Sequence, residues 1–161
     1  MLVTRVGSGS FTEATSTNIT ASLTTTDPFI LKTIGKGVVL NNSTAVTDSG
    51  QQFSDSSLVT GSKDNLRFEI SGVNTTAGTF NLSIRRGDDN LNNKIILETF
   101  VGCSLDPKAN NYISKVVGDQ YAEPTTMEGQ TSVRINGDYP NRSKFVYINA
   151  VNLKTPDYFL N

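Results

Sequence analysis

Alternating apolar and polar side chains predict a run of antiparallel strands in the middle of the chain. Residues 66–70 and residues 80–84 each place an apolar side chain at every second position. This period of two is typical of a strand with one apolar face. Residues 72–78 and 87–93 are rich in Gly, Asn, Asp and Thr, which favour turns. Because a further apolar run occupies residues 94–101, we expect two successive hairpins that share one apolar face.

A short helix is expected after the last of these strands. Asp106 can accept hydrogen bonds from the free N–H groups of a helix start, and Pro107 fits the first turn. Gly118 is placed to end the helix. We therefore expect a helix over about residues 107–117, with Tyr112 and Val116 facing the sheet and Ile113 as a further candidate for the same face. The apolar side chains at helical spacing are Tyr112, Ile113, Val116 and Val117.

The N-terminal part of the chain has a different character. Residues 7–65 are dominated by Ser, Thr, Gly and Asn, with short apolar bursts. Two bursts around a Gly-Lys-Gly segment predict a hairpin from about Phe29 to Leu40. Residues 12–26 and 41–57 carry too little apolar surface to distinguish exposed strands from loops.

The C-terminal part is expected to hold a loop over residues 121–130 and strands over residues 132–136 and 144–148. The fold class predicted by these patterns is α+β and mostly β. It consists of antiparallel hairpins with one short helix, preceded by a Ser/Thr-rich β-like insertion lobe. We expect two units, an edge strand with the variable lobe in residues 1–64 and a β domain in residues 65–161.

Charge and composition limit the partners of the protein. The chain of 161 residues is long enough for one domain with a core or for two small lobes. Its net charge is −1, from 14 basic and 15 acidic residues, so we expect no nucleic-acid partner. No apolar run approaches the ~20 residues of a membrane span, so membrane insertion is not expected. The first residues do not resemble a secretory signal.

The sequence offers little for catalysis. It has no histidine, which removes the commonest general base, the usual zinc ligand and every histidine-dependent triad. Cys103 is the only cysteine, so an internal disulfide cannot form, and we interpret it as a small half-buried residue. We expect that the protein is not an enzyme, that it binds no cofactor, and that it has no catalytic, cofactor-binding or metal-ligating residue.

Three motifs allow alternatives to this interpretation. Asp88 and Asp89 could hold a divalent cation, but a further converging carboxylate is not visible. Arg86-Gly87-Asp88 is a tripeptide that adhesion receptors bind on exposed loops. We interpret the whole turn as solvent-exposed and free of metal. Acceptor triplets for N-glycosylation occur at Asn18, Asn41, Asn42, Asn74, Asn81 and Asn141, and a chain this rich in Asn, Ser and Thr produces them by chance.

The middle of the chain resembles a known protein family. Arg85 to Asp89 reads RRGDD, Ile96 to Thr99 reads ILET, and Leu105 to Asp119 reads LDPKANNYISKVVGD. In this order and without a gap, these segments resemble the part of contractile phage tail sheath proteins that precedes the main assembly core. The likeness covers residues 66–161 well and residues 1–6 loosely.

The resemblance implies a structural virion protein. Sheath subunits form helical rings around a tail tube, and contraction triggered at the baseplate drives the tube through the host envelope. The implied partners are other sheath subunits, the tail tube and the baseplate. The implied location is the phage tail, after assembly in the bacterial cytoplasm. Since whole sheath subunits are several times longer, the 161 residues are expected to be an internal piece. A β-rich surface-binding module such as an adhesin is the alternative.

Overall fold

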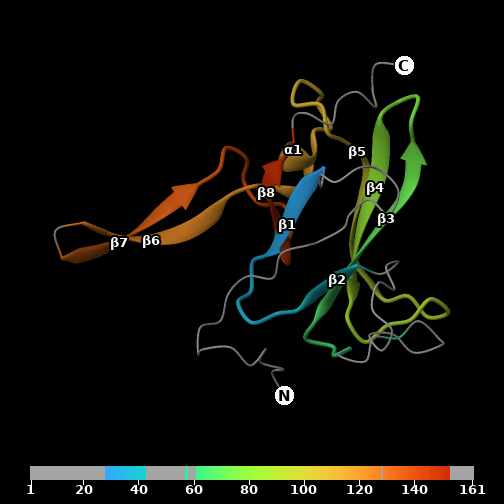
Figure 1. Cartoon of the computed structure of the whole chain (residues 1–161), viewed down its shortest axis with the longest axis horizontal. Coiled ribbons are helices and arrows are strands. Elements are labelled where there is room, and N and C mark those ends of the chain that lie inside the picture. Colours follow the sequence, from blue (N-terminus) through green and yellow to red (C-terminus); the bar gives the residue numbers. More distant parts are fainter. Residues whose placement is uncertain (1–27, 43–56, 58–60, 128, 153–161) are drawn as a thin grey trace.

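The structure is a computed structural model that describes residues 28–42, 57, 61–127 and 129–152. It is mostly β, with antiparallel sheets and one short helix, as the sequence predicts (Figure 1). The elements of the described residues are β1 (Phe29–Thr33), β2 (Leu40–Asn42), β3 (Leu66–Asn74), β4 (Thr79–Arg86), β5 (Ile96–Ser104), α1 (Ile113–Val117), β6 (Tyr121–Met127), β7 (Gln130–Asn136) and β8 (Val146–Val151). None of the helices in these residues is long and apolar enough to cross a membrane.

The largest sheet has the order β2-β3-β4-β5. β3 pairs with β4, and β4 with β5, both in antiparallel register, so the two predicted hairpins are confirmed. A bulge interrupts the second pairing, where Val101 and Gly102 of β5 lie opposite Asn81. Gly102 has a φ of 68°, and its N–H donates to the side-chain oxygen of Asn81. Glycine suits this position because other residues rarely adopt a positive φ.

The expected hairpin from Phe29 to Leu40 is wrong, although both of its strands exist. β1 pairs with β8 in antiparallel orientation, and β2 pairs with β3 in parallel. The separate pairings allow apolar side chains of both strands, Phe29, Leu31 and Leu40, to be buried in one core. Phe29 and Leu31 are 2% and 0% exposed in this arrangement. The N–H of Ile34 extends the pairing by donating to the carbonyl oxygen of Phe145.

One hydrophobic core holds β1 to β5, α1 and β8 together, and we call these elements the body. Phe29, Leu31 and Leu40 belong to the same buried cluster as Phe68 and Leu82. Residues 29–42 are therefore part of the body rather than of a separate lobe, which corrects the expected boundary at residue 65. The edge strand expected at residues 1–6 and most of the expected lobe lie outside the described residues.

The helix starts later than the sequence predicts. It begins at Ile113, and Asp106 instead forms a turn in which its Oδ1 accepts from the N–H of Lys108. Asp often bonds to a nearby backbone N–H in this way, and the turn satisfies the groups that a cap would have served. Ile113, the further candidate for the inward face, is fully buried together with Val117, whereas Tyr112 and Val116 are half-buried. The helix ends at Gly118 as predicted, with a φ of 107°.

The segment expected as a loop after the helix is strand β6. It pairs with β7 over seven residue pairs, from Tyr121 with Asn136 to Met127 with Gln130. Pro124 suggests a loop, but proline is accepted in a strand that has a free edge. Figure 1 shows that the β6–β7 hairpin projects away from the body, and we call it the arm.

Candidate functional site: a buried ion-pair network

The alternation of β4 places its two arginines on opposite faces. Arg85 lies directly opposite Arg67 of β3, and both side chains are fully buried. Two cations facing each other across strands repel, and burial strengthens the repulsion. The arrangement therefore requires an anion close to both guanidinium groups.

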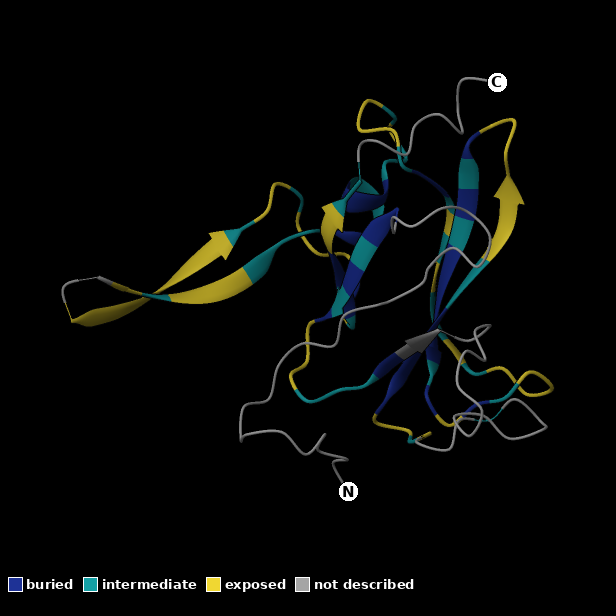
Figure 2. Cartoon of the chain, viewed as in Figure 1, coloured by how far each residue is buried: buried dark blue, intermediate teal, exposed yellow. Residues whose placement is uncertain are grey.

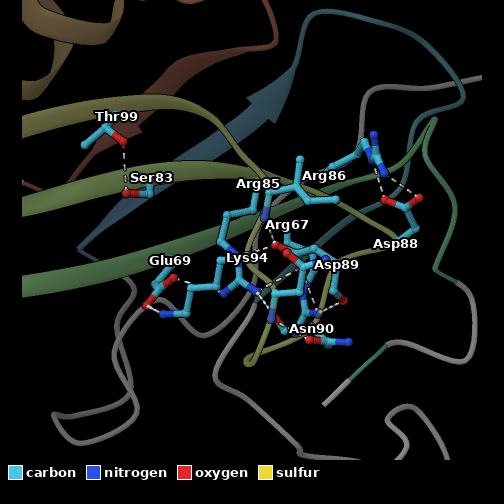
Figure 3. A network of polar contacts seen from close by, with 12 residues as sticks. Arg67, Glu69, Ser83, Arg85, Arg86, Asp88, Asp89, Asn90, Lys94 and Thr99 are labelled. Carbon is cyan, nitrogen blue, oxygen red and sulfur yellow. Dashed lines mark hydrogen bonds and ion pairs between the residues drawn. The ribbon is translucent and has the colours of Figure 1, made fainter. Parts of the chain in front are cut away.

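Asp89 is that anion (Figure 3). Arg85 donates from Nε to Oδ2 at 2.6 Å and from NH2 to Oδ1 at 2.8 Å, a two-pronged contact that matches the planar guanidinium to the carboxylate. Arg67 donates from NH1 to Oδ1 at 3.1 Å and to the backbone oxygen of Asp89 at 2.8 Å. The N–H of Ile95 donates to Oδ2 at 3.0 Å. The carboxylate thus joins β3, β4 and the segment that leads into β5.

Glu69 extends the network toward solvent. Arg85 donates from NH1 to its Oε2 at 2.9 Å, and Lys94 donates from Nζ to its Oε1 at 2.7 Å. We call Arg67, Glu69, Arg85, Asp89 and Lys94 the ion-pair network. It contains three cations and two carboxylates, so it has no carboxylate in excess.

Burial and pairing act in opposite directions on the charges of the network. Burial lowers the pKa of Arg67, and the nearby charge of Arg85 lowers it further, while Asp89 opposes both effects. Burial alone would raise the pKa of Glu69, but the hydrogen bonds and charges of Lys94 and Arg85 bring it below its ordinary value. Removal of one partner therefore leaves a buried charge uncompensated.

The structure corrects the expectation that the whole turn is exposed to solvent. Asp89 is 2% exposed, whereas the neighbouring Asp88 side chain is 34% exposed and pairs with Arg86. The two adjacent carboxylates thus have different environments. Asp89 was expected to be exposed because its contact with Arg67 of the neighbouring strand β3 cannot be seen in the local sequence of the turn.

This geometry does not favour the alternatives suggested by the motifs. Asp88 and Asp89 point to different arginines rather than toward one point (Figure 3). Within the described residues, no group of three or more His, Cys, Asp or Glu could hold a metal ion. Gly87 is buried, its N–H donates to the backbone oxygen of Asn65 at 2.7 Å, and the Arg86 and Asp88 side chains pair with each other. The tripeptide is therefore folded against the body instead of forming a free loop tip.

Other residues that the sequence suggested as candidate sites are buried or make contacts within the fold. Cys103 is completely buried rather than half-buried, and burial raises the pKa of its thiol to about 11. Asn81 lies in β4, as predicted, and its side chain bonds to the bulge. Asn141 bonds through its side chain to the N–H and the carbonyl oxygen of Gln120. Asn74 is exposed at the end of β3, where its side chain accepts from the N–H of Ala77, and Asn18 lies outside the described residues.

Three members of the network, Arg67, Glu69 and Lys94, were not predicted from the sequence. Arg67 and Glu69 occupy alternate positions of one strand, and Arg85 shares their face in the next. Charges of both signs that recur on one face of neighbouring strands can form ion pairs, and this was the available signal.

Comparisons of the chain with family models, with curated proteins and with solved structures found no match.

Proposed function

We propose that this chain is part of a subunit of a contractile tail sheath, a structural protein of the virion. In this proposal its partners are other sheath subunits, the tail tube and the baseplate. It acts in the phage tail, after assembly in the cytoplasm of the bacterial host. It performs no catalysis, and the energy of contraction is stored in the contacts between subunits.

One observation carries the proposal. The three segments that resemble sheath proteins, residues 85–89, 96–99 and 105–119, are consecutive parts of one packed unit in the body. They contain the end of β4, the first half of β5 and the whole of α1. The last residue of the RRGDD segment is Asp89, the buried centre of the ion-pair network. The residues that carry the likeness are thus also residues on which the fold depends.

The hydrogen bonds that Asp89 makes to several strands of the body support the same proposal. A sheath subunit must stay folded while its contacts with neighbours change. Asp89 bonds to β3, to β4 and to the segment before β5, so these strands cannot separate without exposing buried charges. Sliding of these strands under load is opposed for the same reason.

Electron microscopy of the full-length protein that contains these residues tests the proposal. Long helical tubes of regular diameter are expected when the protein is expressed alone. The competing function is a β-rich surface-binding module, which predicts dispersed particles that bind glycans. Dispersed particles under all assembly conditions, together with retention on a glycan array, would reject the sheath assignment.

A further inference from the structure

The root of the arm holds the one Asn-Gly pair of the whole sequence. Asn136 is the last residue of β7, and Gly137 follows it. In such a pair the side-chain amide lies close in the chain to the backbone nitrogen of a residue that has no Cβ. The nitrogen can therefore approach the amide carbon with little steric hindrance. Asn136 is half-buried and Gly137 is exposed, so water reaches both residues.

The fold requires glycine at position 137. Its φ is 101°, which other residues rarely adopt, and a Cβ there would lie 2.4 Å from the backbone oxygen of Asp119. Asp119 is itself fixed at the root of the arm. Its side chain accepts from the N–H of Tyr139 at 2.7 Å, and its own N–H donates to the Tyr139 carbonyl oxygen at 3.0 Å. A bulkier neighbour that would protect Asn136 is thus excluded by the backbone.

The strand register leaves the nitrogen of Gly137 beyond the β6–β7 ladder. Pro124 has no N–H, so its pair with Val133 belongs to the pairs without hydrogen bonds. Antiparallel pairs alternate, and the last pair, Tyr121 with Asn136, is therefore a hydrogen-bonded one. This pair uses the backbone groups of its own two residues. The N–H of Gly137 therefore does not have to leave a bond between the strands before it reacts.

The arm can open while the body stays folded. A lone two-stranded hairpin is marginally stable in water. Of the residues of the arm that the structure describes, none belongs to the buried hydrophobic cluster of the body. Figure 2 shows exposed residues along most of its length. Separation of β6 from β7 therefore exposes little buried surface and costs less free energy than global unfolding. In the open arm the backbone of Asn136 rotates freely.

We propose that Asn136 is a site of spontaneous deamidation, and that opening of the arm sets its rate. The nitrogen of Gly137 loses its proton to hydroxide and bonds to Cγ of Asn136. The bond from Cγ to Nδ2 breaks, and Nδ2 takes a proton from water and leaves as ammonia. Water then adds to either carbonyl group of the cyclic succinimide. Ring opening gives aspartate or isoaspartate at position 136. This modification is independent of the proposed function.

Both products weaken the root of the arm. In the closed arm Nδ2 of Asn136 donates to Oε2 of Glu123 at 3.0 Å. A carboxylate at this position cannot donate, and it brings a second negative charge toward Glu123, which the opposite Arg134 offsets only in part. Isoaspartate also lengthens the backbone directly before Gly137, whose close approach to Asp119 leaves little room for a shift. Deamidation therefore favours the open arm.

Peptide mapping by mass spectrometry tests the site. The folded 161-residue chain is incubated at mildly alkaline pH, and the conversion of each asparagine is followed, with isoaspartate detected by enzymatic methylation. We expect Asn136 to convert before Asn74, an exposed asparagine that is followed by Thr75. Asn136→Gln keeps the amide but makes ring closure less favourable, and it should lose the conversion at this position. Conversion of Asn136 no faster than that of Asn74 would overturn the proposal.

A disulfide across the arm tests the role of opening. Ala122 and Ile135 form a pair without hydrogen bonds, whose short separation suits a disulfide between Ala122→Cys and Ile135→Cys. Cys103 is buried, and its thiol pKa of about 11 keeps it unreactive. We expect slower conversion of Asn136 in the oxidised variant than in the same variant after reduction. Equal rates in the two forms would show that opening of the arm does not control the reaction.

Hydrogen exchange tests the consequence for the arm. Asn136→Asp reproduces one product, and the amides of β6 and β7 should exchange faster in it than in the parent chain, with the body unchanged. Addition of Glu123→Gln removes the facing carboxylate and should slow the exchange again. Unchanged exchange in Asn136→Asp, or no recovery in the double variant, would reject the link between the new charge and the opening of the arm.

Discussion

The β4–β5 hairpin and the arm are both antiparallel hairpins, but they reverse the usual distribution of polar and apolar groups. The connection of β4 to β5 buries Asp89 at 2% exposure. The arm exposes Val133 at 70% and Ile135 at 67%. The difference lies in the neighbours, because β4 is flanked by β3 and β5, whereas among the described strands β6 and β7 pair only with each other.

This contrast teaches that position in the sheet decides burial when alternation alone does not. A charged residue can be buried if a neighbouring strand supplies its counter-ion, as Arg67 does for Asp89. An aliphatic residue stays exposed if no further layer covers its face. Charge burial of this kind adds little net stability, because desolvation offsets most of the Coulomb attraction.

Removal of the central carboxylate should have the largest effect. Asp89→Ala leaves Arg67 and Arg85 buried without their shared anion, and we expect a loss of about 3–5 kcal/mol in the free energy of unfolding. Urea denaturation followed by circular dichroism measures it. The matched control is the adjacent Asp88→Ala, which removes a partly exposed pair and should cost at most about 1 kcal/mol. Equal losses for the two variants would contradict the contrast between them.

The helix offers a smaller comparison of two adjacent valines. Val117 is fully buried and Val116 is only partly buried, so Val117→Ala should cost about 2 kcal/mol and Val116→Ala clearly less. Thermal and urea unfolding of both variants provide the measurement. A larger loss for Val116→Ala would mean that the helix presents a different face to the core.

Acid should weaken the body through Glu69. Its pKa is lowered in the folded protein, so its contribution is present above the ordinary value of 4.5 and is lost as the pH falls through the folded value. Glu69→Gln should therefore flatten the stability curve below about pH 4.5, as measured by urea unfolding at several pH values. The matched control on the arm, Glu123→Gln, should change the acid-induced loss of unfolding free energy less than Glu69→Gln does. Identical curves for Glu69→Gln and the parent chain would exclude this role of Glu69.

The smallest effect is expected on the arm. Replacing Val133 and Ile135 together by Thr retains side chains that favour strands and removes exposed aliphatic groups. The free energy of unfolding should change by no more than about 0.5 kcal/mol per substitution. A loss of several kcal/mol in the free energy of unfolding, measured by differential scanning calorimetry, would mean that Val133 and Ile135 are covered within the chain. The arm would then be buried in the same way as the β4–β5 hairpin.

Local patterns predicted those parts of the fold that depend on nearby residues. The two hairpins from β3 to β5 follow from alternation and from turn-forming residues. The pairing of β1 with β8 was missed because nothing in a strand of five residues specifies a partner so distant in sequence. The helix start was misplaced because the same Asp106 can cap a helix or form a turn, and only the surrounding packing distinguishes the two.

The site was less predictable than the fold. Asp88 and Asp89 are chemically identical and adjacent, so their sequence alone cannot say which one is buried. The answer depends on Arg67, which lies 22 positions before Asp89 and reaches it only because β3 pairs with β4 in one particular register. A slip of that register by one residue would turn Arg67 to the other face of the sheet.

The pairing of β1 with β8 has a consequence for synthesis of the chain. Phe29 pairs with Val151, so β1 leaves the ribosome long before its partner exists. Until residues 146–151 emerge, Phe29 and Leu31 have no strand to pair with, although β3, β4 and β5 can already fold together. Such long-range pairing forms slowly, and the unpaired strand is exposed to other chains in the interval. Before residues 146–151 have been translated, β1 is therefore available for contacts with other chains.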